Sequence, residues 1–245
     1  MTSANTSPGP AMTSEATPRA RVHLALVLLA LASGATDAFA FLLLGGIFTA
    51  NMTGNLVLAG LFSRPDWLST LAGAVTAVVC FAGSSFVGFW VIRPTANADS
   101  SLATLRLLGV AVVAAGLQLV IVAEWLVWEG HTTLPLQCAF IGCSAAALGL
   151  QTVLAKKISG AAGLTTTFVT GTLTSVMEEL ADRKRGSKAI QVVIVLSLSA
   201  GAFAGTALSS SVPVIAPVLP FVLVAAAVIL VVSSRASLES MTAKR

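Results

Sequence analysis

The sequence predicts an all-α membrane protein with six transmembrane helices and two short re-entrant half-helices, built as an inverted repeat of three crossings each. Three observations favour this fold class. Only 10% of the residues are charged and 56% are hydrophobic, whereas roughly 25% of the residues in a soluble domain are charged. Uncharged runs long enough to cross a bilayer recur along the chain. Two polar segments that interrupt the apolar sequence resemble each other.

Six apolar runs predict the crossings. A helix needs about 20 predominantly apolar residues to cross the hydrocarbon core of a bilayer. Prolines mark several of the boundaries, as at Pro65 and Pro135, because proline is favoured at helix starts and in loops. The predicted crossings are residues 22–45, 67–92, 106–128, 134–155, 188–210 and 213–233.

The two ends of the chain lie outside the predicted membrane domain. Residues 1–18 are rich in Ser, Thr, Pro and Ala, which predicts a disordered tail. Residues 19–235 are expected to form a single transmembrane domain, with repeat one at about 22–128 and repeat two at about 134–233. Residues 236–245 are expected to form a cytoplasmic tail. The net charge of +4 comes from basic residues at helix ends, which the positive-inside rule explains, so no nucleic-acid partner is expected.

The tryptophans and cysteines are given structural roles. Tryptophan prefers the membrane interface, and four tryptophans fall near predicted helix ends, where we expect them to anchor the protein. They are Trp67, Trp90, Trp125 and Trp128. The three cysteines lie inside apolar helices without paired spacing, which is typical of packing residues rather than of a disulfide or a zinc site. They are Cys80, Cys138 and Cys143.

The distribution of basic residues indicates whether residues 46–63 and 160–182 cross the bilayer or enter it and return on the same side. If both segments enter the bilayer and return, and both termini are cytoplasmic, Arg64 is the only basic residue outside. If both segments cross, Arg93, Arg106 and the pair at 156–157 move to the external face. The positive-inside rule disfavours the second arrangement. The sequence therefore predicts two re-entrant segments.

An internal repeat supports this prediction. The stretch "GIFTANMTGNL" at 46–56 aligns with "GLTTTFVTGTL" at 163–173 with five identities. The same offset carries a stripe of small residues at 80, 84 and 88 onto a second stripe at 197, 201 and 205. Small residues at every fourth position let membrane helices pack closely. Each repeat has three crossings, an odd number, so the second copy must be inverted, as in many secondary transporters.

The repeated motif predicts a binding site. Each half-helix would begin near the bilayer midplane, where its free N–H groups and partial positive charge suit an anion or a carboxylate. Threonine and asparagine side chains would complete the site, although helix capping and close packing are the alternative explanation for these residues. The residues expected to line the site are Thr49, Asn51, Thr53, Gly54 and Asn55 from the first motif and Thr166, Thr170 and Gly171 from the second.

Asp37 is the only carboxylate deep within an uncharged helical stretch. An ionisable residue at that depth is costly, which indicates a functional site. We expect Asp37 to bind a coupling proton or cation or to orient the motif, with Gln151 as its counterpart in the second repeat; the alternative is a hydrogen bond to a neighbouring helix. Glu124 lies close to a helix end and is interpreted as structural. The sequence shows no phosphate-binding loop, metal-ligand spacing or nucleophile with a base, so neither an enzyme nor a cofactor is expected.

The stretch "GATDAFAFLLLGGIFTANMTGNLVLAG" at 34–60, together with "TTTFVTGTLT" at 165–174, resembles the YoaK-type family of uncharacterised bacterial inner-membrane proteins, a domain of unknown function. The resemblance covers roughly residues 20–235. It implies a multi-pass protein of the bacterial plasma membrane and does not imply an activity.

These observations predict a secondary transporter that moves a small polar or anionic solute across the lipid bilayer and forms a homo-oligomer. Two alternatives remain open. A passive channel would give flux without coupling. A membrane scaffold or assembly protein would use the motif residues only for packing.

Overall fold

The computed structural model of the chain describes residues 16–93, 100–128, 132–159, 169–181 and 188–242, and in these ranges every regular element is helical. Helix starts follow local signals, such as a proline in the first turn of the helix that begins at Leu134. The elements are α1 (Ala16–Leu43), α2 (Met52–Gly60), α3 (Trp67–Ile92), α4 (Ser100–Trp128), α5 (Leu134–Ile158), α6 (Val169–Ala181), α7 (Lys188–Ser211), the 3₁₀ turn η2 (Pro213–Ile215) and α8 (Val218–Thr242).

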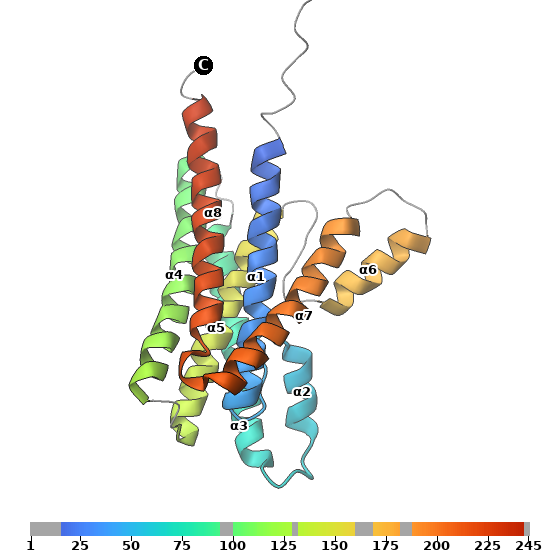
Figure 1. Cartoon of the computed structure of the whole chain (residues 1–245), viewed down its shortest axis with the longest axis vertical. Coiled ribbons are helices and arrows are strands. Elements are labelled where there is room, and N and C mark those ends of the chain that lie inside the picture. The colour runs from blue at the N-terminus through green and yellow to red at the C-terminus, as the bar shows by residue number, and fades with distance from the viewer. Residues whose placement is uncertain (1–15, 94–99, 129–131, 160–168, 182–187, 243–245) are drawn as a thin grey trace, which may run out of the picture.

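Six helical segments in the described residues are long and apolar enough to cross a membrane, as the hydropathy of the sequence predicts. Their bounds are Ala20–Leu43, Trp67–Ile92, Ser101–Trp128, Leu134–Ile158, Ala189–Ser211 and Pro213–Ser233. The last of these combines η2 with α8. α1, α4 and α8 run along the long axis of the molecule, and α7 crosses α1 obliquely (Figure 1).

Two short helices stand apart from these spans. α2 has 9 residues and α6 has 13, which gives lengths of about 14 and 20 Å at 1.5 Å per residue. Neither length reaches the roughly 30 Å of a hydrocarbon core. Both helices begin near mid-height of the bundle in Figure 1, and they run toward opposite ends.

The chain reverses between α1 and α2 at two glycines. Gly45 and Gly46 have φ angles of 80° and 76°, in the left-handed region that favours glycine. α1 therefore ends at Leu43, two residues before the predicted end at residue 45. Residues 44–51 then lead back to the start of α2, beside the last turns of α1.

α1 packs most extensively against α7 and also packs against α8. A Cβ atom added at Gly34 of α1 would meet the backbone of Leu198, and one added at Gly201 of α7 would meet the backbone of Leu31. Gly205 approaches the backbone of Ala35 in the same way. Since two backbones approach this closely only where side chains are absent, these glycines set the distance between the two helices.

α5 takes the corresponding place beside α3 and α4. A Cβ atom added at Gly149 of α5 would meet the hydroxyl of Ser84 on α3, and one added at Gly142 would lie 3.3 Å from the Cys80 sulfur. Gly88 of α3 faces Val153 in the same interface. The predicted stripe on α3 thus packs against α5, and Gly201 and Gly205 of the second stripe pack against α1.

The prediction that all four tryptophans anchor the protein at the membrane interface is wrong for Trp125. Its side chain is only 2% exposed, and its ring packs edge-on against Phe39 and Phe140. The indole N–H donates a 2.9 Å hydrogen bond to the carbonyl oxygen of Pro213. A buried tryptophan needs such an acceptor, and here the turn at η2 supplies it.

Candidate functional site

The candidate site lies where the chain folds back from α1 toward α2. Asp37 precedes the end of α1 by less than two turns. Because the chain reverses at Gly45 and Gly46, residues 48–50 return to the level of Asp37. The first binding motif and the intramembrane carboxylate, which were predicted separately from the sequence, are therefore in direct contact.

One carboxylate oxygen of Asp37 accepts three hydrogen bonds from this returning segment. Its Oδ1 atom accepts from the backbone N–H of Thr49 at 2.7 Å, from the Thr49 hydroxyl at 3.0 Å and from the backbone N–H of Ala50 at 2.7 Å. Hydrogen bonds to a charged acceptor are roughly twice as strong as those between neutral groups. The ionised form of Asp37 therefore fixes the backbone that leads into α2.

Asn55 holds the same segment from the side of α2. Its Nδ2 atom donates to the carbonyl oxygen of Phe48 at 2.6 Å, and its Oδ1 atom accepts from the N–H of Phe48 at 3.0 Å. The side chain is fully buried. Both backbone groups of an irregular residue are thus satisfied by one amide, which a buried, non-helical segment requires.

Asn51 caps the N-terminus of α2. Its Oδ1 atom accepts from the N–H of Gly54 at 3.2 Å and from the hydroxyl of Thr53 at 2.9 Å. A Cβ atom added at Gly54 would lie 2.9 Å from the ring of Phe48, so a larger residue would push that ring away. Helix capping and close packing, the alternative explanation of the motif, therefore account for part of it.

Exposure separates the motif residues into two groups. Thr49 and Asn55 are fully buried, and their polar atoms bond within the protein. Asn51 and Thr53 are exposed, and Asp37 is partly exposed. The first group fixes the shape of the segment, and the second group can reach a ligand.

Two amide side chains, one on α5 and one on α4, contact α1 on the N-terminal side of Asp37. Gln151 of α5 donates from Nε2 to the carbonyl oxygen of Leu29 at 2.8 Å and to the hydroxyl of Ser33 at 2.9 Å. Gln118 of α4 lies 3.5 Å from the hydroxyl of Thr36. The structure thus places Gln151 one to two turns before Asp37 on α1 rather than against its carboxylate.

Ser33, Thr36 and Gln118 are not predicted as site residues from the sequence. Serine, threonine and glutamine in apolar helices are a weak signal, because such residues are routine in membrane proteins. Gln118 is 1% exposed, and its Oε1 atom has no hydrogen-bond partner among the described residues. The sequence signal for this residue is a glutamine in the middle of the long apolar run that forms α4.

The second half of the predicted site is described only in part. Thr166 lies outside the described residues, and so does the side chain of Thr170. Gly171 lies in the first turn of α6 and is partly buried. Within the described ranges, no group of three or more His, Cys, Asp or Glu side chains could hold a metal ion.

Comparison with known proteins gives a family and a curated relative. Residues 25–232 match the family model described as "Protein of unknown function (DUF1275)". The chain is also 31% identical over 158 residues to UPF0700 transmembrane protein YoaK of Bacillus subtilis (strain 168). The aligned region covers 64% of this chain and 67% of that protein. No solved structure matches the chain. The resemblance predicted from the two motifs is confirmed.

Proposed function

This chain belongs to the DUF1275 family of proteins of unknown function, and we propose that it is a secondary transporter of a small polar or anionic solute. The observation that carries this proposal is the triple hydrogen bond from the segment before α2 to the Asp37 carboxylate. It joins an ionisable residue of a spanning helix to an interrupted helix, the combination that lines the midplane sites of many transporters.

The order and the packing of the helices support an inverted repeat. Val169, the first residue of α6, follows Met52, the first residue of α2, by 117 positions. Ser100 and Val218, the first residues of α4 and α8, are 118 positions apart. The packing of α1 on α7 and α8 has its counterpart in the packing of α5 on α3 and α4. Two such halves could rock around a site between them and open it to each side in turn.

In the proposed site, the exposed residues of the first motif contact the solute, and the buried ones position them. Asn51 and Thr53 face the solute at the start of α2, beside the partly buried Gly54. Thr49 and Asn55 hold the segment in place through the bonds described above. The second motif contributes Thr166, Thr170 and Gly171, and Gln151 fixes α5 against α1.

The negative charge of Asp37 decides when an anion can bind. The N-terminus of α2 carries partial positive charge, and the ionised carboxylate already compensates it. A solute anion would meet like-charge repulsion there until Asp37 takes up a proton. A protonated Asp37 also binds the N–H groups of Thr49 and Ala50 less strongly. Proton uptake therefore favours both anion binding and release of the segment, which couples the two fluxes.

The function is tested with the purified protein in two steps. A thermal-unfolding screen against anions, carboxylates and nucleobases identifies compounds that stabilise the protein, because specific binding stabilises the native state. Counterflow of a stabilising compound is then measured in proteoliposomes. Wild-type protein is expected to show counterflow that depends on a proton gradient, and Asp37→Asn is expected to lose that dependence. Asp66→Asn, which removes a carboxylate outside the spans, is the matched control.

Three results would contradict the proposal. Flux without counterflow, unchanged in Asp37→Asn, would indicate a passive channel. Failure of every compound to stabilise the protein would indicate a scaffold. Retained proton dependence in Asp37→Asn would remove Asp37 from the coupling step.

The re-entrant placement of α2 has a separate test in cells. We propose that the protein lies in the bacterial inner membrane as a homo-oligomer, with both termini cytoplasmic. In a variant without native cysteines, Arg64→Cys should react with an impermeant thiol reagent added outside, and Arg93→Cys should not. Both are exposed or nearly so. Reaction at Arg93→Cys alone is the result expected if α2 crosses the bilayer or if the whole protein has the opposite orientation, and it would overturn the predicted topology. Reaction at both positions would overturn it as well.

A further inference from the structure

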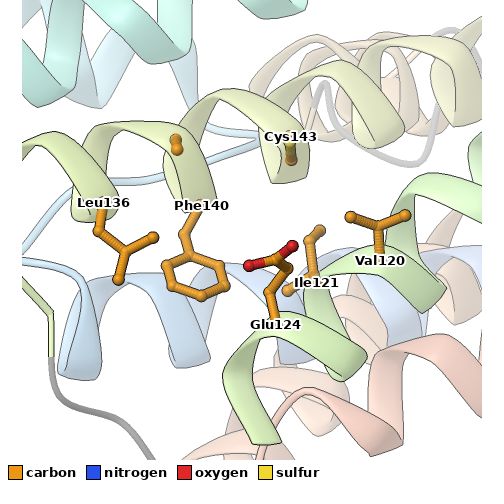
Figure 2. A pocket seen from close by; sticks show the side chains of 7 residues that line it. Val120, Ile121, Glu124, Leu136, Phe140 and Cys143 are labelled. Atoms are coloured by element: carbon orange, nitrogen blue, oxygen red, sulfur yellow. The ribbon is translucent and has the colours of Figure 1, made fainter. Parts of the chain in front are cut away.

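A groove of about 200 Å³ lies between α4 and α5, apart from the site at Asp37. Figure 2 shows the side chains that form its walls, which come from the last turns of α4 and the first turns of α5. The walls are apolar except for one carboxylate. They include Val120, Ile121 and Glu124 of α4 and Leu136, Phe140 and Cys143 of α5.

The carboxylate of Glu124 is the only charged group that lines this groove. Figure 2 shows it directed toward the space between Ile121 and Phe140. In the described part of the chain, Glu124 has no ion pair, and the ion pair found there joins Arg64 to Asp66. The Glu124 side chain is exposed at the open side of the groove, and a carboxylate beside apolar walls in a membrane protein is favoured by water or by a cation as its partner.

The position of Glu124 lets a ligand arrive from the membrane surface. It precedes Trp128, the last residue of its span, by four positions, which is about 6 Å along a helix. Val120 is 47% exposed on the outer side of the bundle. The groove is therefore open at the depth where amphipathic molecules collect, with a polar end near water and an apolar end in lipid.

We propose that this groove binds an organic ammonium ion that carries an apolar body. The Glu124 carboxylate supplies the opposite charge, and the apolar walls take the apolar body. The volume falls below the 300–1,000 Å³ of common ligand pockets, so the bound part of the ligand is small. It could belong to a free amphipathic amine or to the ammonium headgroup of a membrane lipid.

The proposal is tested by binding to the full-length protein in phosphatidylcholine nanodiscs. The probes are benzyltrimethylammonium and phenylacetate, which are similar in size and opposite in charge. We expect benzyltrimethylammonium to raise the unfolding temperature and phenylacetate to have no effect. Glu124→Gln should weaken benzyltrimethylammonium binding at least tenfold. Glu178→Gln, which removes an exposed carboxylate from α6, should leave binding unchanged.

A second variant keeps the test decisive if Glu124→Gln folds poorly. Ala139→Trp places a large side chain at an exposed position that lines the groove, and it should also abolish binding. Replacing the phosphatidylcholine nanodiscs by dodecyl maltoside micelles, which carry no ammonium group, identifies the source of the ammonium. A lipid headgroup as the occupant predicts tighter probe binding in the micelles, because phosphatidylcholine no longer competes, and a free amine as the occupant predicts equal binding. Equal binding of phenylacetate, or unchanged binding in both groove variants, would overturn the proposal.

Discussion

Asp37 and Thr49 are joined twice, because the Asp37 carboxylate accepts both the backbone N–H of Thr49 at 2.7 Å and its hydroxyl at 3.0 Å. Twelve positions separate the two residues, and the reversal at Gly45 and Gly46 lies between them. A change in the charge of Asp37 therefore acts directly on the segment that begins α2. This contact underlies the first of the predictions below.

Removal of the Asp37 carboxylate should destabilise the protein. Asp37→Ala leaves the N–H groups of Thr49 and Ala50 without their acceptor, and each buried unsatisfied group costs about 1–3 kcal/mol. We expect the free energy of unfolding to fall by about 3 kcal/mol. Reversible unfolding of the purified protein in mixed micelles measures the change. Asp37→Asn keeps an acceptor oxygen and should lose less, and equal stability of Asp37→Ala and wild type would contradict the hydrogen bonds described here.

The amide of Asn55 should not tolerate exchange for a carboxylate. Asn55→Asp keeps the acceptor for the N–H of Phe48 but replaces the Nδ2 donor, so two oxygen atoms then face each other at the carbonyl of Phe48. We expect a loss of at least about 2 kcal/mol, because a buried charge adds to the lost hydrogen bond. Thermal unfolding provides the measurement. A variant that unfolds at the wild-type temperature would show that the two hydrogen bonds between Asn55 and the backbone of Phe48 contribute little to the stability of the protein.

Thr53 should separate function from stability. Its side chain is exposed and bonds only to Asn51 among the contacts described for it, so Thr53→Val should change the free energy of unfolding by less than about 0.5 kcal/mol. The same variant should weaken solute binding, because it removes a hydroxyl from the proposed contact surface. Ligand-induced thermal shifts of the two proteins test both statements. Unchanged binding would assign Thr53 to capping alone.

The spans and the first motif could be predicted because their signals are local. Hydropathy alone identifies runs such as 67–92, which coincides with α3. Residue type and depth in the membrane predict both Asp37 and Thr49 as site residues. Their contact could not be derived, because it depends on the left-handed turn at Gly45 and Gly46. Local sequence permits such a turn but does not require it.

The partners of Gln151 and Gln118 depend on how helices cross, which the sequence of one helix does not determine. Alignment of the two repeats suggested that Gln151 corresponds to Asp37, but its amide reaches Leu29 and Ser33. The crossing is fixed by close approach of helices at glycines such as Gly34 and Gly149. The depth of a polar residue could be predicted, and the neighbour that it faces could not.

Asp66, which lies outside the membrane spans, should make the stability of the protein depend on pH in the acidic range. The Arg64 guanidinium donates to it at 3.1 and 3.0 Å, and this interaction lowers the pKa of the Asp66 carboxyl below its usual value. The unfolded chain thus binds a proton more readily, so the contribution is present at neutral pH and is lost as the pH falls below about 4. Asp66→Asn should therefore show a smaller decrease in unfolding temperature between pH 7 and pH 3. The exposed pair is screened by salt, so 1 M salt should reduce the difference, and an unchanged pH response would contradict the assignment.

Close packing of α1 on α7 predicts that Gly34 cannot be replaced even by alanine. The added Cβ atom would meet the carbonyl oxygen of Leu198 and, at 2.8 Å, the backbone nitrogen of Ala202. Backbone atoms cannot rotate away as a side chain can, so the helices would have to separate, at a cost of about 3 kcal/mol or more. Gly116→Ala in α4 is the matched control, because no atom lies within 4 Å of its added Cβ. Alanine has the higher helix propensity, so this control should be as stable as wild type or up to about 1 kcal/mol more stable. Unfolding temperatures that fall equally in both variants would mean that the close approach of α1 to α7 does not determine the effect at Gly34.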